Sequence, residues 1–160
     1  MIKRKTWQEK LADSKDLPKV VEINEKQSKR WGTGTCAIPS PKEVNEIMRH
    51  IPKGKLLTIN NIRDIIAQKY NATIGCPITT GIFAWISANA ADEMAAEGKK
   101  KITPYWRTLK AKGELNSKYP GGIERQIELL ESEGHKIYQK SCHFFVRDFE
   151  KHILTFVKVI

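Results

Sequence analysis

The sequence predicts an α+β fold that is mainly helical, with short β-strands toward its N- and C-terminal ends. Two stretches in the middle of the chain repeat apolar residues at helical spacing, and each follows a residue that can cap a helix. Short runs rich in β-branched and aromatic residues lie nearer the two ends, and such runs are typical of strands. The 160 residues suit one domain with an N-terminal arm.

The charge balance favours a polyanionic partner. Lysine and arginine number 28 against 18 acidic residues, which gives a net charge of +10 and favours nucleic acid first. No apolar run is long enough to span a membrane and no signal peptide follows the basic start, so we expect a cytoplasmic protein without a membrane partner. The cysteines and histidines lack metal-ligand spacing, so the sequence predicts neither a metal nor a cofactor.

Residues 1–39 form the predicted N-terminal arm. Residues 6–9 read Thr-Trp-Gln-Glu, a capping box that starts a short helix. Residues 19–23 are strand-like. We expect Trp7 and Trp31 to anchor the arm on the domain, and the sequence assigns the arm no function.

The predicted domain, residues 40–160, begins with a capped helix. Ser40 is its N-cap, Pro41 its first residue, and Glu43 closes the capping box. Thr58 caps the next helix. The apolar stripe of the first helix consists of Val44, Ile47, Met48 and Ile51, and that of the second of Ile62, Ile65, Ile66 and Tyr70.

Residues 71–75 are the turn of a predicted helix-turn-helix. The second helix begins at Cys76 and Pro77 and stops at Gly98. One face of this helix is a strip of small residues, which admits a close approach by another surface or equally by a neighbouring helix. The strip consists of Gly81, Ala84, Ala88 and Ala91. The lysines at 99–101 follow the helix, where phosphate binding and a solvated helix end are both open.

Four short motifs occur in a specific order over roughly residues 43–134. They are Ile51-Pro52-Lys53-Gly54-Lys55, Pro104-Tyr105-Trp106-Arg107, Tyr119-Pro120-Gly121-Gly122, and Leu129-Leu130 followed by Glu133-Gly134. Together they resemble the C-terminal domain of the DNA alkyltransferases, which remove alkyl groups from the O6 oxygen of guanine. The resemblance implies a winged-helix domain that binds DNA through its helix-turn-helix.

The resemblance also implies that this chain is not an enzyme. In the family the turn reads Pro-Cys-His-Arg-Val, so Tyr105 stands at the position of the cysteine nucleophile and Trp106 at that of the histidine base. A phenol with a reference pKa of about 10 is neutral at pH 7, and an indole N–H only donates. Glu133, at the third position, has no imidazole to orient. The chain is similar to the alkyltransferase-like branch, which lacks the cysteine and binds damaged DNA without repairing it.

The resemblance assigns two sets of site residues. The predicted pocket consists of Asn89, Tyr105, Trp106, Arg107, Tyr119 and Glu133, and the aromatic rings are either stacking surfaces or core. We expect Tyr105 to face the pocket with Trp106 packed beneath it, and Asn89 to link the second helix to the pocket by hydrogen bonds. The predicted DNA-binding residues are Thr58, Thr79, Thr80, Gly81, Ala84, Ser87, Ala88, Lys99, Lys100 and Lys101.

Two positions depart from the family in a way that bears on base flipping. Ile59 falls where the family has a tyrosine that helps to turn the damaged nucleotide out of the helix. Thr80 falls where the family has an arginine finger. Both departures argue against base flipping by the residues that the family uses. From the motifs and the charge, the sequence predicts a monomeric, non-catalytic protein that binds duplex DNA and recognises alkylated or modified bases. An RNA-binding or protein-interaction module on the same fold is an alternative, as is an enzyme with Cys76 as nucleophile, whose thiol pKa a helix N-terminus would lower.

The residues after Gly134 are predicted to form short strands. Residues 136–138, 142–146 and 153–159 have the composition of strands. Pairing with residues 19–23 is one arrangement open to them.

Overall fold

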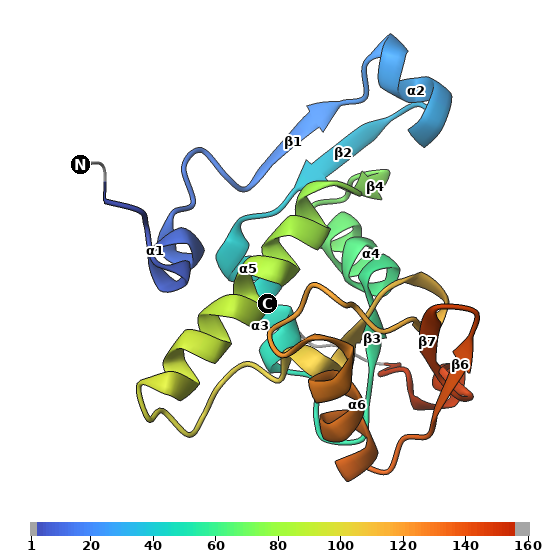
Figure 1. Cartoon of the computed structure of the whole chain (residues 1–160). Helices are drawn as coiled ribbons and strands as arrows, with labels where there is room; N and C mark the ends of the chain where they lie inside the picture. Colours follow the sequence, from blue (N-terminus) through green and yellow to red (C-terminus); the bar gives the residue numbers. More distant parts are fainter. Residues whose placement is uncertain (1–2, 156–160) are drawn as a thin grey trace.

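A computed structural model of the chain describes residues 3–155 (Figure 1). The fold combines helices with short strands, as the sequence predicts, and the winged-helix assignment stays a prediction. Within the described residues the helices are α1 Trp7–Ala12, α2 Glu25–Trp31, α3 Pro41–Arg49, α4 Ile59–Lys69, α5 Thr79–Ala96 and α6 Gly122–Ser132. The strands are β1 Lys19–Glu22, β2 Thr35–Ile38, β3 Leu57–Thr58, β4 Ile74–Gly75, β5 Thr108–Leu109, β6 Ile137–Lys140 and β7 His143–Val146.

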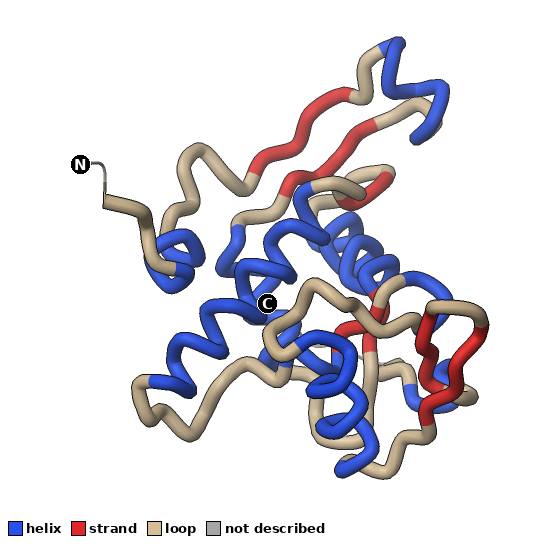
Figure 2. The backbone as a smooth tube through the Cα atoms, viewed as in Figure 1, coloured by secondary structure: helices blue, strands red, loops and turns tan. Residues whose placement is uncertain are grey.

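Helices α3, α4 and α5 lie together in the middle of the molecule (Figures 1 and 2). Strands β1 and β2 extend away from them with α2 at their tip, whereas α6 and the β6–β7 hairpin lie on the opposite side (Figure 1). None of the helices between residues 3 and 155 is both long enough and apolar enough to cross a membrane.

Three capping boxes start α1, α3 and α4. The boxes of α1 and α3 are predicted, and for α4 the cap Thr58 is predicted but not its box partner Asn61. The side chains of Thr6, Ser40 and Thr58 each accept a hydrogen bond from the backbone N–H three residues later. The side chain at that third position in turn accepts a hydrogen bond from the cap's own N–H, so that two backbone donors left open at a helix start are satisfied. These helices therefore begin where local side-chain chemistry dictates.

Three of the four residues of the small-residue strip of α5 are packed inside the protein, whereas Gly81 is half-buried. Ala84, Ala88 and Ala91 are buried in the main core with Val44 and Met48 of α3. Residues without bulky side chains let the two helix backbones approach closely, which is why the strip faces α3. Of the two roles that the sequence leaves open for the strip, packing against a neighbouring helix is the one observed.

Helix α5 begins later than predicted. The backbone N–H of Cys76 donates to the carbonyl of Ala37 (2.9 Å), which continues the β2–β4 pairing past the end of β4. This pairing holds Cys76 in extended structure, and the helix starts at Thr79. The end of the helix agrees with the prediction, because Gly98 follows it with a positive φ of 87°.

The sheet topology differs from the expected one. Strand β1 pairs with β2 in antiparallel orientation, and β2 pairs with β4 in parallel. Strands β6 and β7 pair with each other, so the pairing of the C-terminal strands with residues 19–23 is wrong. Strands β3 and β5 form a second, two-residue parallel pair.

The C-terminal part of the described chain closes this small sheet. The N–H of Leu56 donates to the carbonyl of His152 (2.9 Å), and the N–H of Leu154 donates to the carbonyl of Leu56 (3.0 Å). Residues 156–159 of the third predicted strand lie outside the described residues.

The predicted arm contacts the rest of the protein at two places. Helix α1 packs along α5, with the ring of Trp7 perpendicular to that of Trp85 at a centroid distance of 4.7 Å. Thr35 and Thr73 exchange hydrogen bonds between backbone N–H and side-chain oxygen (3.0 and 3.1 Å). Because β2 pairs with β4, the division of the chain at residue 40 stays a prediction rather than a visible boundary.

Candidate functional site

The tyrosines of the predicted pocket are part of the core. Tyr105 and Tyr119 are 4% and 3% exposed, and their rings meet almost at right angles, 5.6 Å apart. The Tyr105 hydroxyl donates to the carbonyl of Pro120 (3.4 Å). Burial raises the pKa of both phenols, so both are neutral at pH 7. The expectation that Tyr105 faces a pocket is wrong, because its side chain fills the space beneath α5.

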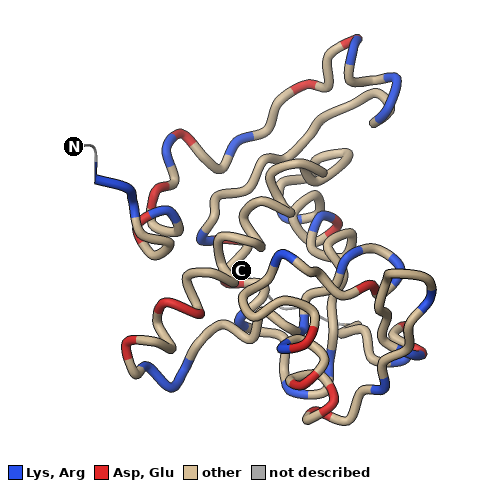
Figure 3. Tube along the Cα trace, in the orientation of Figure 1, with Lys and Arg blue, Asp and Glu red and all other residues tan. Residues whose placement is uncertain are grey.

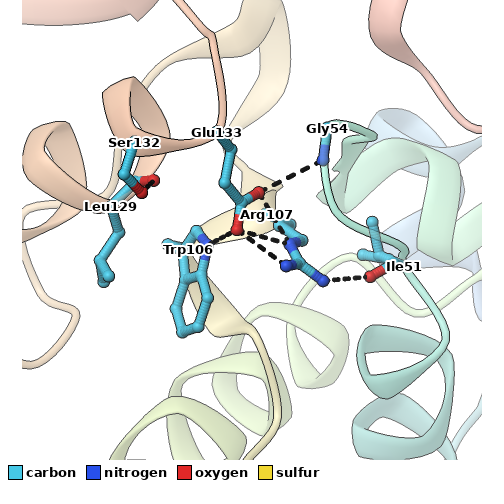
Figure 4. Close-up of polar contacts among 7 residues, drawn as sticks. All are labelled: Ile51, Gly54, Trp106, Arg107, Leu129, Ser132 and Glu133. Atoms are coloured by element: carbon cyan, nitrogen blue, oxygen red, sulfur yellow. Dashed lines mark hydrogen bonds and ion pairs between the residues drawn. The ribbon is translucent and has the colours of Figure 1, made fainter.

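Trp106, Arg107 and Glu133 form a polar hub beside these rings (Figure 4). The Glu133 carboxylate accepts from the Trp106 indole N–H (2.9 Å) and from Arg107 Nη2 (2.7 Å). The N–H of Gly54 also points to it (3.4 Å), and Arg107 Nη1 donates to the carbonyl of Ile51 (2.7 Å). The hub thus joins the end of α6, the turn at 105–107 and the turn at 51–54.

The electrostatics of the hub keep Glu133 ionised. Burial by itself raises the pKa of this carboxyl, but hydrogen bonds from Arg107 and Trp106 outweigh it, so that the pKa lies below its usual value. Sequence reasoning left Glu133 without an imidazole partner. In the structure the indole supplies the missing N–H donor, and the role of the three residues is to hold the fold together.

Asn89 does not join α5 to the turn at 105–107. Its side-chain amide donates to the carbonyl of Trp85, one turn earlier in the same helix (2.9 Å). A different pair ties the segment before the turn to the helical core, because Thr103 Oγ1 donates to Asn45 Oδ1 of α3 (2.7 Å). Nothing in the sequence pattern singled out Asn45, which lies outside the motifs of the family.

Five of the predicted DNA-binding residues are buried. Thr80 Oγ1 donates to the carbonyl of Cys76 (2.7 Å), and Ser87 Oγ donates to that of Phe83 (2.9 Å). Thr58 is occupied as the cap of α4. The structure therefore does not bring these five residues to an exposed surface. The buried residues are Thr58, Thr80, Ala84, Ser87 and Ala88.

The lysines at 99–101 are exposed, but they lie at the far end of α5. The helix has 18 residues, and a rise of 1.5 Å per residue makes it about 27 Å long. Figure 3 shows these lysines at the lower left, beyond the C-terminal end of the helix. Their contact with DNA stays a prediction, as does that of Thr79 and Gly81, which are half-buried near the N-terminal end.

A groove of about 590 Å³ lies between α5, the start of α4 and the segment 110–118. We call it the α5 groove. Three of its residues are large apolar side chains that α5 leaves in solvent: Ile78 (58% exposed), Ile82 (45%) and Trp85 (36%). They recur at i, i+4 and i+7 and form one row on the helix surface. The α5 groove is lined by Ile59, Asn60, Ile78, Gly81, Ile82, Trp85, Lys110, Ala111, Asn116, Ser117 and Lys118.

The two walls of the α5 groove differ in chemistry. The α5 wall carries the apolar row and has no lysine or arginine, because residues 79–96 contain none. The opposite wall carries Lys110 and Lys118, and no carboxylate lines the groove. Lys110 lies 3.9 Å from Glu114, outside the lining. Such an arrangement fits a ligand with a flat apolar part and an anionic part.

The lysine wall is held in place by the neighbouring elements. The N–H of Asn116 donates to Gln126 Oε1 of α6 (2.9 Å), and the N–H of Leu115 donates to the carbonyl of Phe144 in β7 (2.9 Å). The same Gln126 side chain reaches the carbonyl of Trp106 (3.3 Å). The groove was missed at the sequence level because its walls come from segments far apart in the chain.

The cysteines do not provide a nucleophile in the α5 groove. Cys36 and Cys76 are buried, and Cys142 is exposed. Burial and the neighbouring Cys76 raise the pKa of Cys36 to about 11. The N–H of Thr79, the first residue of α5, donates to the Cys76 sulfur (3.5 Å), as the enzyme alternative requires, but the side chain is buried and does not line the α5 groove. Between residues 3 and 155, no three His, Cys, Asp or Glu side chains are grouped as metal ligands.

Comparison with known proteins finds similarity in structure alone. No protein-family model and no curated protein matches the chain. Two crystal structures from S. pombe match over 72% of this chain and 94% of theirs, each at 21% identity. One is Atl1 in complex with damaged DNA containing O6-carboxymethylguanine, with a TM-score of 0.50, and the other is ATL in complex with DNA, with a TM-score of 0.52. The chain shares their fold. The fold relation that the sequence motifs predicted is confirmed.

Proposed function

We propose that this protein is a monomeric, non-catalytic DNA-binding protein of the alkyltransferase-like type that receives an alkylated or modified base in the α5 groove. The groove itself is the observation that carries the proposal. It combines an apolar wall with a lysine wall, on a fold that two structures of DNA complexes share.

The chemistry of the groove supports a base attached to a phosphate backbone. Bases turned out of a duplex are held by stacking on apolar and aromatic side chains and by hydrogen bonds to their edges. Trp85 and the isoleucines at 78 and 82 supply the stacking surface. The donors and acceptors for the base edges come from Asn60, Asn116 and Ser117. Lys110 and Lys118 neutralise phosphates on either side of the base.

The absence of alkyl transfer is part of the proposal. Tyr105 is neutral and buried, and the Trp106 indole N–H is engaged by Glu133, so neither residue can act as nucleophile or base. Cys36 and Cys76 are buried away from the α5 groove. Recognition without repair is the activity that this arrangement supports.

Fluorescence anisotropy with labelled oligonucleotides tests the proposal. The probes are a plain duplex, the same duplex with one O6-carboxymethylguanine, and the corresponding single strand. We expect the modified duplex to bind most tightly and the affinity for every probe to fall steeply with salt. Replacing Lys110 and Lys118 by alanine should reduce the slope of log affinity against log salt by about 2, because two phosphate contacts are lost.

The matched control replaces two exposed lysines of α2. The Lys26→Ala, Lys29→Ala variant changes the net charge equally but lies outside both the α5 groove and the predicted DNA-binding set. An equal loss in both variants would show that general charge, not the groove, determines binding. No binding by the wild-type protein at low salt would remove DNA as the partner.

A protein-interaction module is the second candidate, and one observation favours it. Ile78 and Ile82 are about half exposed, which is unusual for isoleucine on a surface that only meets nucleic acid. If the protein binds neither DNA nor RNA, we expect the apolar row to be the binding surface for a protein partner.

A further inference from the structure

Trp85 lies at the junction of the α5 groove and the N-terminal arm. It lines the groove and is 36% exposed. The ring of Trp7 from α1 stands perpendicular to it at 4.7 Å between centroids. A single aromatic side chain therefore connects the arm, to which the sequence assigned no function, with the groove that carries the proposed function.

Helix α1 is fastened to α5 through the carboxylate of Glu93. The backbone N–H groups of Trp7 and Gln8 donate to it (2.9 and 3.1 Å), and the Gln8 side chain adds a third contact (3.2 Å). A carboxylate at a helix N-terminus satisfies open N–H donors and is favoured by the helix dipole. Lys10 lies over the Trp7 ring (4.2 Å), and Leu11 is buried. These contacts fix the ring of Trp7 and, through it, that of Trp85.

We infer that Trp85 is a stacking platform for an unpaired nucleobase and that Trp7 is its positioning residue, which makes the N-terminal arm part of the binding site. The inference rests on the proposed function. It deepens it by naming the side chain on which the base stacks and by giving the arm a role, since a base that has left the duplex stack offers its face to a protein ring.

Charge complementarity identifies the occupant. A free anion would leave the isoleucine row and Trp85 in water. An apolar peptide would leave Lys118 without an anionic partner in the groove and Lys110 with only the carboxylate of Glu114, 3.9 Å away. A nucleotide has a planar base for the apolar α5 wall and a phosphate for the lysine wall. No carboxylate lines the groove to repel that phosphate.

The experiment compares two labelled DNA duplexes that differ by one unpaired thymine, with a short thymidine single strand as third probe. Binding is followed by anisotropy and by quenching of tryptophan fluorescence. We expect the bulged duplex and the single strand to bind more tightly than the fully paired duplex. Trp85→Leu should weaken binding of the unpaired probes by roughly 10- to 100-fold, since stacking on one aromatic ring has about that effect. It should also abolish most of the quenching.

The arm is tested by variants that do not touch the groove. Trp7→Leu removes the perpendicular ring and should lower the affinity for the unpaired probes by about 2- to 10-fold. Trp7→Phe keeps an aromatic ring and should restore binding. Glu93→Gln loosens α1 through different atoms and should reproduce the Trp7→Leu result if the protein stays folded. Trp31→Leu on α2 is the matched control, because it removes a tryptophan of the arm that lies outside the groove.

The outcomes separate this inference from the proposed function. If no probe binds the wild-type protein, both are wrong. If DNA binds but Trp85→Leu leaves affinity and quenching unchanged, the platform is wrong and DNA binding stands. Equal affinity for paired and unpaired probes also overturns the platform. If Trp85→Leu weakens binding while Trp7→Leu and Glu93→Gln do not, the role of the arm is wrong.

Discussion

The hub around Glu133 allows a quantitative test of the fold. We consider Glu133→Gln, which keeps the size of the side chain and removes its charge. The carboxylate accepts from Trp106 Nε1 and from two nitrogens of Arg107, and both partners of the ion pair are buried, with side-chain exposures of 14% for Arg107 and 6% for Glu133. The variant leaves the guanidinium without its counter-charge and turns an N–H₂ group toward other donors.

The expected cost of this change is about 3 kcal/mol of unfolding free energy at pH 7. Removing one partner of a buried ion pair costs about 3–5 kcal/mol, and the amide oxygen that remains keeps one acceptor, so the lower end applies. In a chain of this size, that corresponds to a fall in melting temperature of about 6–12 °C. Urea unfolding followed by tryptophan fluorescence measures it directly.

The loss of stability caused by Glu133→Gln should depend on pH. The folded pKa of Glu133 lies below its unfolded value, which is about 4.3. Its contribution to stability is therefore complete above the unfolded pKa and is lost as the pH falls through the folded pKa. The gap between wild type and variant should be constant from pH 7 to about pH 5 and should close at more acidic pH.

A control variant on the same helix isolates the effect of burial. Glu131→Gln changes the same charge at an exposed position of α6 and should shift stability by no more than about 0.5 kcal/mol. A gap below about 1 kcal/mol for Glu133→Gln at pH 7, or one that does not depend on pH, would refute the assignment of the hub as a buried, charged tie.

Two further predictions concern α5 and the cysteines. Ala88→Leu should destabilise the protein by about 1–3 kcal/mol, because overpacking forces α3 and α5 apart. The control Ala95→Leu, at an exposed position of α5, should leave the melting temperature unchanged. An unchanged melting temperature for Ala88→Leu would mean that the strip faces solvent. Incubation with DNA that carries O6-carboxymethylguanine should leave the intact mass of the protein unchanged, and an adduct on Cys76 would instead support the enzyme alternative.

Local features of the fold could be predicted from the sequence. Each capping box spans only four consecutive residues. Its hydrogen bonds therefore do not depend on the surface against which the helix packs. The starts of α1, α3 and α4 at Thr6, Ser40 and Thr58 follow from this alone. The parallel pairs β2–β4 and β3–β5 could not be predicted, because strands of two residues have no periodicity and their partners lie far along the chain.

The orientation of α5 was beyond sequence reasoning for a physical reason. The helix has an apolar row on one face and a strip of small residues on another, and both recur at helical spacing. Bulky residues such as Ile82 ordinarily face the core. Here α3 approaches so closely that only small residues such as Ala88 fit between the helices, and the bulky row is left in solvent.

The place of the site motifs could be predicted, but the direction of their side chains could not. Motif order correctly grouped Trp106, Arg107 and Glu133, which meet in the hub. It could not reveal that the tyrosine ring at 105 fills the interior, because a ring is far larger than the cysteine that the family has there. Ile78 and Trp85, which line the α5 groove, belong to no motif.

The two hydrogen bonds between Leu56 and the segment 152–154 bear on how the protein is made. Leu56 and Leu57 precede α4 and are fully buried in the finished fold. Leu57 pairs with Thr108, whereas the partner of Leu56 is Ile153. On a ribosome that adds about 5–20 residues per second, Leu56 waits roughly 5 to 20 seconds for that partner. Throughout that interval α4 has its cap but not the backbone that covers its start. Local signals thus begin the fold early, and one late segment completes it.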